Sequence, residues 1–220
     1  MTTKVIRWRL IIVLTILACI AAAGITGYFA WRRMYAVIAY YHDTERLREW
    51  IAANPALLNS RPPRIIADPG AGRTPLGIAI EHNWAEGVEM LVKAGADIHA
   101  PANELNDKPL EIAISWYATD AARMLLKLGV DPSIFNRLQH PLDQCIHGAD
   151  YDNYYRIATL LIESGKVPKD HYAKTWKTLE MLTSFDQGLR LLHTMKKHGM
   201  DLGDLQIPDK VAPRDEPDAP

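Results

Sequence analysis

Hydrophobic and polar positions divide the chain into one long apolar segment and a remainder with helical periodicity. Residues 10–31 read LIIVLTILACIAAAGITGYFAW, 22 residues without a charged side chain. A helix of this length is roughly 33 Å long at about 1.5 Å per residue, which matches the hydrocarbon core of a bilayer. Basic residues flank the segment on both sides, including Arg32 and Arg33 directly after it. The pattern predicts an uncleaved transmembrane anchor, or signal anchor, behind a basic tail over residues 1–9.

Two cleavable signals are the alternatives to this anchor. Ala21 to Ala23 would suit the cleavage site of a secretory signal peptide, and Ala18 before Cys19 partly suits a lipoprotein signal. We favour the anchor because apolar character continues past both points. The flank before the segment carries one more positive charge than the flank after it. In a bacterial cell this predicts a single-pass inner (plasma) membrane protein whose C-terminal domain is periplasmic or extracytoplasmic.

The rest of the chain repeats itself at a period of about 34 residues. A leucine recurs early in each unit, at spacings of 34, 32 and 37: Leu76, Leu110, Leu142 and Leu179. A glycine recurs near the end of each unit, at spacings of 34, 36 and 34: Gly95, Gly129, Gly165 and Gly199. Such periodicity predicts an array of structural repeats.

The unit around residues 72–101 predicts two short antiparallel helices and a turn. Thr74 suits an N-cap, and Pro75 suits the first helical position, where its missing N–H costs nothing. Apolar residues at helical spacing follow over 76–80 and again over 88–92. Gly95 suits the left-handed residue that ends the second helix.

These residues resemble the ankyrin repeat family. The sequence GRTPL at 72–76 and GAD at 95–97 follow the family pattern closely, and later units follow it progressively less. Residues 34–55 have the two-helix pattern without the signature, as a terminal unit would. The resemblance covers about residues 34–202 and implies an all-α, ankyrin-repeat solenoid of helix-turn-helix units. Residues 207–220, with four prolines and four acids, predict a flexible tail.

The sequence also departs from the family pattern. The usual histidine after Pro-Leu is replaced, so hydrogen bonds between adjacent loops must differ; the replacements are Gly77, Glu111, Asp143 and Glu180. The linker over 55–71 is long, and the third unit has extra residues around 148–155. The tyrosines of that insertion predict either a contact loop or the start of a lengthened second helix.

The overall charge hides an asymmetry between the two parts. The net charge of −1 combines five basic residues and no acid in residues 1–33 with 20 basic and 26 acidic residues in the remainder. An acidic repeat domain argues against nucleic acid as a partner, because phosphate binding requires a basic face. The two cysteines lie too far apart in this arrangement to predict a disulfide.

Motifs for catalysis, metals and cofactors are missing from the sequence. It contains no HExxH, CxxC, GxSxG or phosphate-binding glycine loop. Cys145 and His147 lie two residues apart, but Cys145 takes the packed position of Ala79 and Ala113 in the other units, which favours a buried thiol. We therefore predict a protein that is not an enzyme, with no cofactor, metal or small-molecule substrate.

The resemblance implies that turn tips and the exposed side of each first helix form a concave surface that binds a protein partner. The corresponding positions are Arg73, Glu81, His82, Asp107, Ser115, Trp116, Gln139, His147, Trp176 and Phe185. Large aromatics at exposed positions are the residues most able to anchor an interface. Trp116, Trp176 and Phe185 could instead seal the contact to the next repeat.

The sequence thus predicts a membrane-tethered binding module that captures a protein partner on its concave face. One role open to such a protein is immunity against a secreted bacterial toxin. The alternatives are an accessory factor in envelope stress resistance and a structural assembly subunit that pairs through its membrane helix. Gly24 and Gly27 supply small residues for such pairing, although without a GxxxG pattern.

Overall fold

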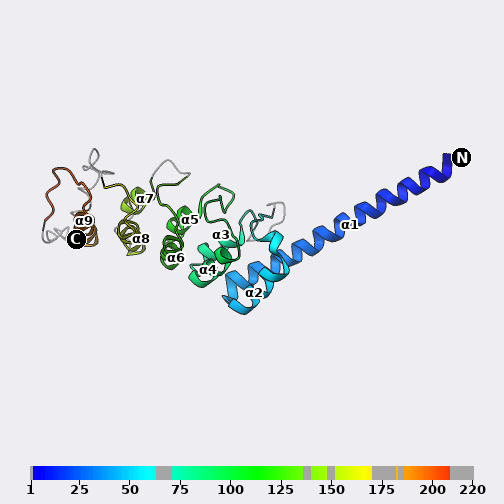
Figure 1. Cartoon of the computed structure of the whole chain (residues 1–220), viewed down its shortest axis with the longest axis horizontal. Coiled ribbons are helices and arrows are strands. Elements are labelled where there is room, and N and C mark those ends of the chain that lie inside the picture. Colours follow the sequence, from blue (N-terminus) through cyan, green and yellow to red (C-terminus); the bar gives the residue numbers. More distant parts are fainter. Residues whose placement is uncertain are drawn as a thin grey trace, which may run out of the picture.

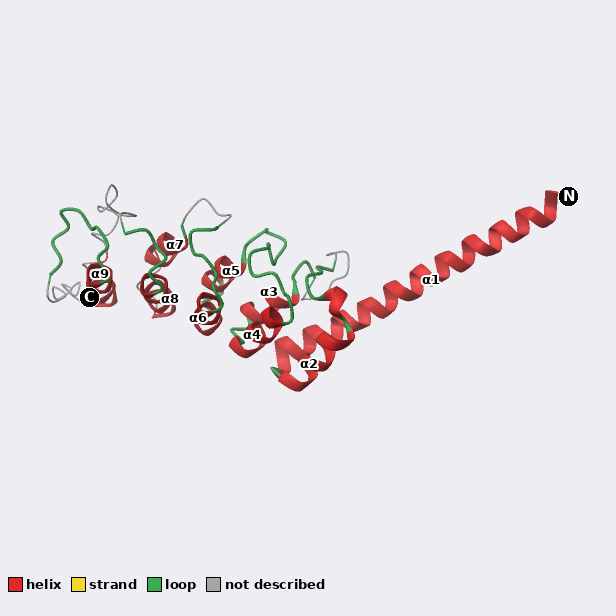
Figure 2. Cartoon of the chain, viewed as in Figure 1, coloured by secondary structure: helices red, strands yellow, loops and turns green. Residues whose placement is uncertain are grey.

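The computed structural model describes residues 2–62, 71–135, 140–147, 152–169, 182 and 186–208. Within these ranges every regular element is helical and none is a strand, which confirms the predicted all-α class (Figure 2). The elements in chain order are α1 (Thr2–Ala36), the π-helical turn η1 (Val37–Tyr41), α2 (Thr44–Ala53), the 3-10 turn η2 (Pro55–Leu57), α3 (Pro75–Glu81), α4 (Ala85–Lys93), α5 (Pro109–Ser115), α6 (Thr119–Lys127), α7 (Pro141–His147), α8 (Asp152–Glu163) and α9 (Asp186–Lys197).

Two layers of helices build the solenoid. The first-helix row consists of η1, α3, α5 and α7, each in contact with the next. The second-helix row consists of α2, α4, α6, α8 and α9, again in contact in series. Figure 1 shows the units side by side, with their long loops projecting from one side of the array. Tyr154 and Tyr155 lie inside α8, so this part of the insertion lengthens the second helix.

The first helices begin with a different cap in each unit. The Thr74 hydroxyl accepts a hydrogen bond from the Gly77 N–H at 3.0 Å, as predicted. In α5 the Glu111 carboxylate instead reaches back to the Lys108 N–H at 2.8 Å. In α7 the imidazole Nδ1 of His140 accepts from the Leu142 N–H at 3.1 Å. Three different side chains thus accept hydrogen bonds from backbone N–H groups at the helix starts, which have no partner within the helix.

The second helices end at glycines in the left-handed region, which confirms the sequence interpretation. Gly95 and Gly129 have φ values of 105° and 103°. Only a residue without Cβ adopts such values without strain. The recurring glycine therefore marks the exit from each second helix.

Asn83 links one repeat to the next at the turn between α3 and α4. Its backbone is left-handed, with φ at 51°. Its side-chain oxygen accepts hydrogen bonds from the N–H groups of Asp120 at 2.9 Å and Ala121 at 3.0 Å. These donors lie in the first turn of α6, whose own N-cap, Ala118, has no side-chain acceptor. An asparagine of one unit therefore caps a helix of the following unit.

Helix α1 runs without interruption into the solenoid. Its last turns and η1 bury Met34, Val37 and Ile38 in the same core as the repeats. The Trp50 indole N–H donates to the Ala30 carbonyl oxygen at 2.8 Å, which fastens α2 to α1. The end of α1 is therefore part of the first repeat.

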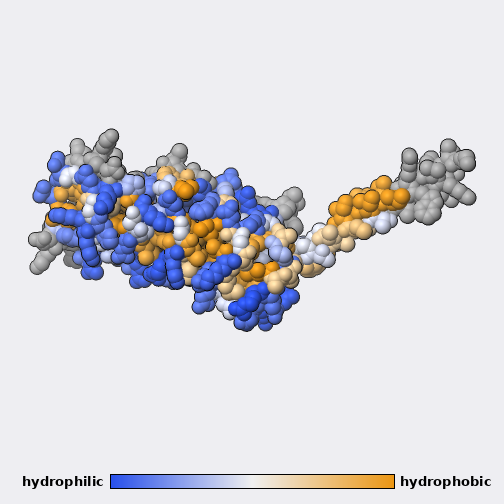
Figure 3. All heavy atoms as spheres, in the orientation of Figure 1, coloured by the Kyte–Doolittle hydropathy of each residue, from blue (hydrophilic) through white to orange (hydrophobic). Residues whose placement is uncertain are grey.

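The remainder of α1 extends away from the solenoid (Figure 1). Among the described residues one helical stretch, Ile12–Tyr41 of α1 and η1, is long and apolar enough to cross a membrane, and its apolar 18-residue window has a mean hydropathy of 2.2. Hydrophobic residues cover much of the described part of this extension, whereas hydrophilic residues cover much of the repeats (Figure 3). Residues such as Ile20 and Phe29 are largely exposed there.

Candidate binding surface

The ends of the first helices present a row of aromatic side chains. His82 and Trp116 occupy the same position in successive units, directly after α3 and α5. Trp116 is 51% exposed, so about half of its surface is open to a partner. The neighbouring Tyr117 is also exposed, and its ring meets that of Tyr154 edge-on at 4.9 Å between centroids. Tyr154 thus holds the Tyr117 ring in place while much of the surface of Trp116 and Tyr117 remains accessible.

His82 is half-buried and extends this row toward the first repeat. Its ring meets Tyr35 edge-on at 6.5 Å, and Tyr35 in turn meets Tyr40 at 5.9 Å. Burial lowers the pKa of His82, and the nearby charges of His42 and Arg73 lower it further. The imidazole therefore favours its neutral form, which can both donate and accept a hydrogen bond.

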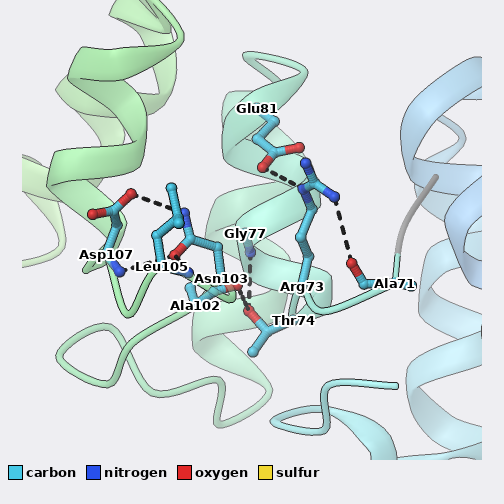
Figure 4. A network of polar contacts seen from close by, with 9 residues as sticks. All are labelled: Ala71, Arg73, Thr74, Gly77, Glu81, Ala102, Asn103, Leu105 and Asp107. Carbon is cyan, nitrogen blue, oxygen red and sulfur yellow. Dashed lines mark hydrogen bonds and ion pairs between the residues drawn. The ribbon is translucent and has the colours of Figure 1, made fainter. Parts of the chain in front are cut away.

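Arg73, which precedes α3, forms an ion pair with Glu81, the last residue of that helix. The Arg73 Nε donates to a Glu81 carboxylate oxygen at 2.6 Å, and another guanidinium N–H donates to the Ala71 carbonyl oxygen at 3.5 Å (Figure 4). Burial raises the pKa of Glu81, although the hydrogen bond from Arg73 opposes this effect. Both side chains are mainly buried, so solvent screens the pair little and the Arg73 charge also acts on His82.

Asp107 differs from the exposed turn tip that the sequence predicted. It is only 5% exposed, and its carboxylate accepts a hydrogen bond from the Asn103 side-chain amide at 3.0 Å. The side-chain oxygen of Asn103, Oδ1, accepts hydrogen bonds in return from the backbone N–H groups of Leu105 and Asp107 (Figure 4). This exchange closes the loop on itself, because buried polar groups must find partners inside the turn.

Leu105 takes the exposed place that was expected for Asp107. Its side chain is 72% exposed at the outside of the same loop. The loop is also held from the other side, where the Arg61 guanidinium donates to the Asn103 carbonyl oxygen at 2.6 Å. A fixed loop with an exposed leucine presents an apolar contact at little cost in conformational entropy.

The structure describes only part of the remaining predicted site residues. Ser115 is partly buried at the end of α5. His147 ends α7, but its side chain lies outside the part of the chain that the structure describes. Gln139, Trp176 and Phe185 lie outside the described residues altogether.

Several exposed apolar residues were missed by the sequence analysis. Tyr40 and Tyr41 are 70% and 62% exposed at the end of η1, the place that His82 and Trp116 occupy in later units. The signal was available in the two-helix pattern of residues 34–55, where the tyrosines directly precede the turn. Leu105 had no such signal, because its exposure depends on the fold of the loop.

The described residues bring no catalytic arrangement together. They contain no group of three or more His, Cys, Asp or Glu side chains that could hold a metal ion. Cys145 is fully buried in α7, and burial, with a smaller contribution from Asp143, raises the pKa of its thiol far above the ordinary value. Such a thiol supplies no thiolate for nucleophilic chemistry at neutral pH.

A comparison with protein families agrees with the architecture. A family model described as ankyrin repeats (3 copies) matches residues 34–136, which begins at the end of α1 and includes α2 to α6. No curated protein matches the chain.

Proposed function

Because this chain is an ankyrin repeat protein, we propose that it is a membrane-tethered module that captures a protein partner on its concave face. Ankyrin repeats are protein-protein interaction modules, and a solenoid presents an extended surface for that purpose. The exposed aromatic row over Tyr40, Tyr41, Trp116 and Tyr117 is the observation that carries the proposal. Tyrosine and tryptophan dominate the binding energy of interfaces, particularly where neighbouring side chains already hold their rings.

The half-buried side chains beside this row supply polar complementarity. His82 contacts Tyr35, and Glu81, the ion-pair partner of Arg73, directly precedes His82 at the end of α3. A partner that covers the aromatic rings would also cover these groups. The acidic repeat domain favours a partner surface with basic rather than acidic residues around its apolar centre.

Tethering would raise the local concentration of the module at the membrane. Helix α1 is continuous with the first repeat, so the surface would stay at a fixed distance from the bilayer. We place the chain in the inner membrane, with residues 10–31 spanning it once and the repeats on the periplasmic side. Neutralisation of a secreted toxin by an immunity protein fits this arrangement, and so does an accessory role in envelope stress resistance.

Site-specific photocrosslinking tests the binding surface. A photoreactive residue at position 116 or 117, in the full chain in its native membrane, is expected to crosslink one defined protein. The same residue at position 123 or 127 on the second-helix row is expected to give none. Trp116→Ala should then weaken binding of that purified protein by about tenfold or more, whereas Arg123→Ala should not.

Circular dichroism and thermal unfolding verify that both variants remain folded. Equal crosslinking from both rows, or unchanged affinity of Trp116→Ala, would contradict the assignment of the surface. The identity of the crosslinked protein separates the two roles: a secreted toxin supports immunity, and an oxidative-stress or envelope protein supports the accessory role.

Replacement of residues 10–31 by an unrelated apolar helix tests the assembly alternative. The binding module requires only that the solenoid be tethered, so function is expected to survive. Loss of function despite normal membrane insertion would favour an assembly subunit that pairs through its own helix.

A further inference from the structure

A groove lies where the end of α1 meets α2. It has a volume of about 310 Å³ and is lined by Ala30, Arg33, Glu49, Trp50, Ala53 and Asn54. Trp50 forms its rigid wall, because this indole is buried and donates to the Ala30 carbonyl oxygen at 2.8 Å. Asn54 is likewise fixed, since its side-chain amide donates to the Trp50 carbonyl oxygen at 3.0 Å. The groove is therefore a built feature of the helix junction.

Two opposite charges stand beside each other in this groove. The Arg33 guanidinium and the Glu49 carboxylate lie 3.9 Å apart, too far for a hydrogen bond. Their side chains are 70% and 72% exposed. An exposed pair at this separation contributes little to stability, and each partner keeps the capacity to bind another charged group. The groove thus offers a cation and an anion to a ligand that carries both.

The groove also lies near the C-terminal end of α1, directly after the apolar segment. Ala30 and Arg33 are within the last turns of that helix, directly after exposed apolar residues such as Ile25 and Phe29. The position of the groove relative to the membrane rests on the proposed transmembrane role of residues 10–31. With those residues in the hydrocarbon core, the groove would lie at the level of the lipid headgroups, where tryptophan and arginine side chains are favoured.

We propose that this groove binds the headgroup of a phospholipid that carries both a phosphate diester and a primary ammonium, as an ethanolamine headgroup does. The phosphate accepts hydrogen bonds from the Arg33 guanidinium, and the ammonium donates to the Glu49 carboxylate. Ala30, Ala53 and the Trp50 ring face the apolar start of the lipid chains. A choline headgroup lacks the N–H donors for Glu49, and a glycerol headgroup lacks the positive charge.

Native mass spectrometry of the full-length protein tests this proposal. The protein is purified in detergent and equilibrated with an equimolar mixture of phosphatidylethanolamine, phosphatidylcholine and phosphatidylglycerol. We expect wild type to retain about fivefold more of the ethanolamine lipid than of either other lipid, the scale of one exposed pair of charged contacts. Arg33→Gln with Glu49→Gln should abolish this preference.

A matched control removes the same two charges from α2 outside the groove. Arg48 and Glu45 form an exposed ion pair on that helix, so Arg48→Gln with Glu45→Gln should leave the preference intact. Equal retention of the three lipids by wild type would overturn the proposal, as would equal retention by wild type and the Arg33–Glu49 double variant. A lipid-free dimer that this double variant dissociates would assign the groove to a second copy of the chain instead.

Failure of the lipid proposal can be distinguished from failure of the tether. Resistance of the chain to alkaline extraction from native membranes reports on membrane spanning alone. A chain that resists extraction but shows no lipid preference overturns only the headgroup site, whereas an extractable chain overturns both.

Discussion

The residue that follows each Pro-Leu pair determines how closely the next loop approaches the helix. At Gly77 the Ala102 carbonyl oxygen comes so near that a Cβ would lie only 2.5 Å away. That carbonyl accepts from the Thr74 N–H at 2.9 Å, a bond between adjacent loops. At the equivalent position Glu111 is buried and caps its own helix. The two replacements of the family's histidine, Gly77 and Glu111, therefore have different local surroundings.

Gly77→Ala should destabilise the solenoid by about 1–3 kcal/mol, because the added methyl group pushes the Ala102 carbonyl away and weakens its bond to Thr74. Chemical unfolding of the full-length protein in detergent measures the change. Gly24→Ala serves as the control, since a Cβ at this helical glycine meets nothing within 4 Å. An equal stability of Gly77→Ala and wild type would show that the loop shifts without cost.

His82 predicts a pH dependence of stability. Its folded-state pKa lies below the ordinary value of 6.5, first because of burial and then because of the neighbouring positive charges. The unfolded chain therefore takes up the proton more readily as the pH falls from about 7 to 5, and the folded state loses stability. His82→Gln should lose less stability than wild type over this range. His99→Gln, a change at an exposed histidine, should follow wild type.

At the scale of elements, the repeat signals predicted the helices from α3 to α6 because each is bounded by a proline, a glycine or both. The junction between anchor and repeats had no such boundary. No glycine or proline occurs between Gly27 and Pro55, so the helix passes Arg32 and Arg33 and continues into η1. The charges that marked the expected end of the membrane segment do not end the helix, because a guanidinium is compatible with helical backbone.

The candidate surface was predictable in part. The resemblance to ankyrin repeats implied that Trp116 is exposed, and its side chain is 51% exposed. The burial of Asp107 could not be predicted, because it depends on the hydrogen bonds that Asn103 makes within the folded loop. The pairing of Arg73 with Glu81 likewise joins residues eight apart that no helical spacing brings together. Local patterns predict elements, whereas contacts through loops require the fold.

Two isoleucines of the same continuous helical run test the junction. Ile38 is fully buried in the repeat core, and Ile25 is 56% exposed on the extension. Ile38→Ala should lower the free energy of unfolding of the solenoid by about 2–4 kcal/mol through loss of apolar contacts and a residual cavity. Ile25→Ala should change it by less than about 0.5 kcal/mol. Denaturant unfolding monitored by circular dichroism compares them, and equal effects would mean that the junction packs differently.

At the scale of the whole molecule, α1 continues through η1 into the first-helix row and so becomes one end of the solenoid. A solenoid gains stability from contacts between neighbouring repeats. Its terminal unit therefore needs an outer face that is stable without a further repeat packed against it. The end of α1, η1 and α2 form that terminal unit here, with Trp84 of the following unit stacked on His42 at 5.1 Å. The helical run that we propose to attach the chain to the membrane therefore also caps the array.

The two free cysteines allow one labelling experiment to test both the proposed membrane segment and the core of the repeats. Cys19 is exposed on the extension of α1, within the segment proposed to span the bilayer, and Cys145 is fully buried in the third unit with a raised pKa. A maleimide requires a thiolate in contact with water. In intact membranes a membrane-impermeant maleimide should label neither thiol, because lipid covers one and the repeat core covers the other.

Addition of mild detergent and then of denaturant should separate the two thiols. Detergent micelles admit the reagent to Cys19 more readily than a bilayer does, whereas Cys145 should react only once the repeats unfold, so mass spectrometry should record one label and then two. Labelling of Cys19 in intact membranes would contradict the transmembrane assignment while leaving the solenoid untouched. Labelling of Cys145 before unfolding would mean that the third unit opens by itself, since a solenoid can lose one unit without global unfolding.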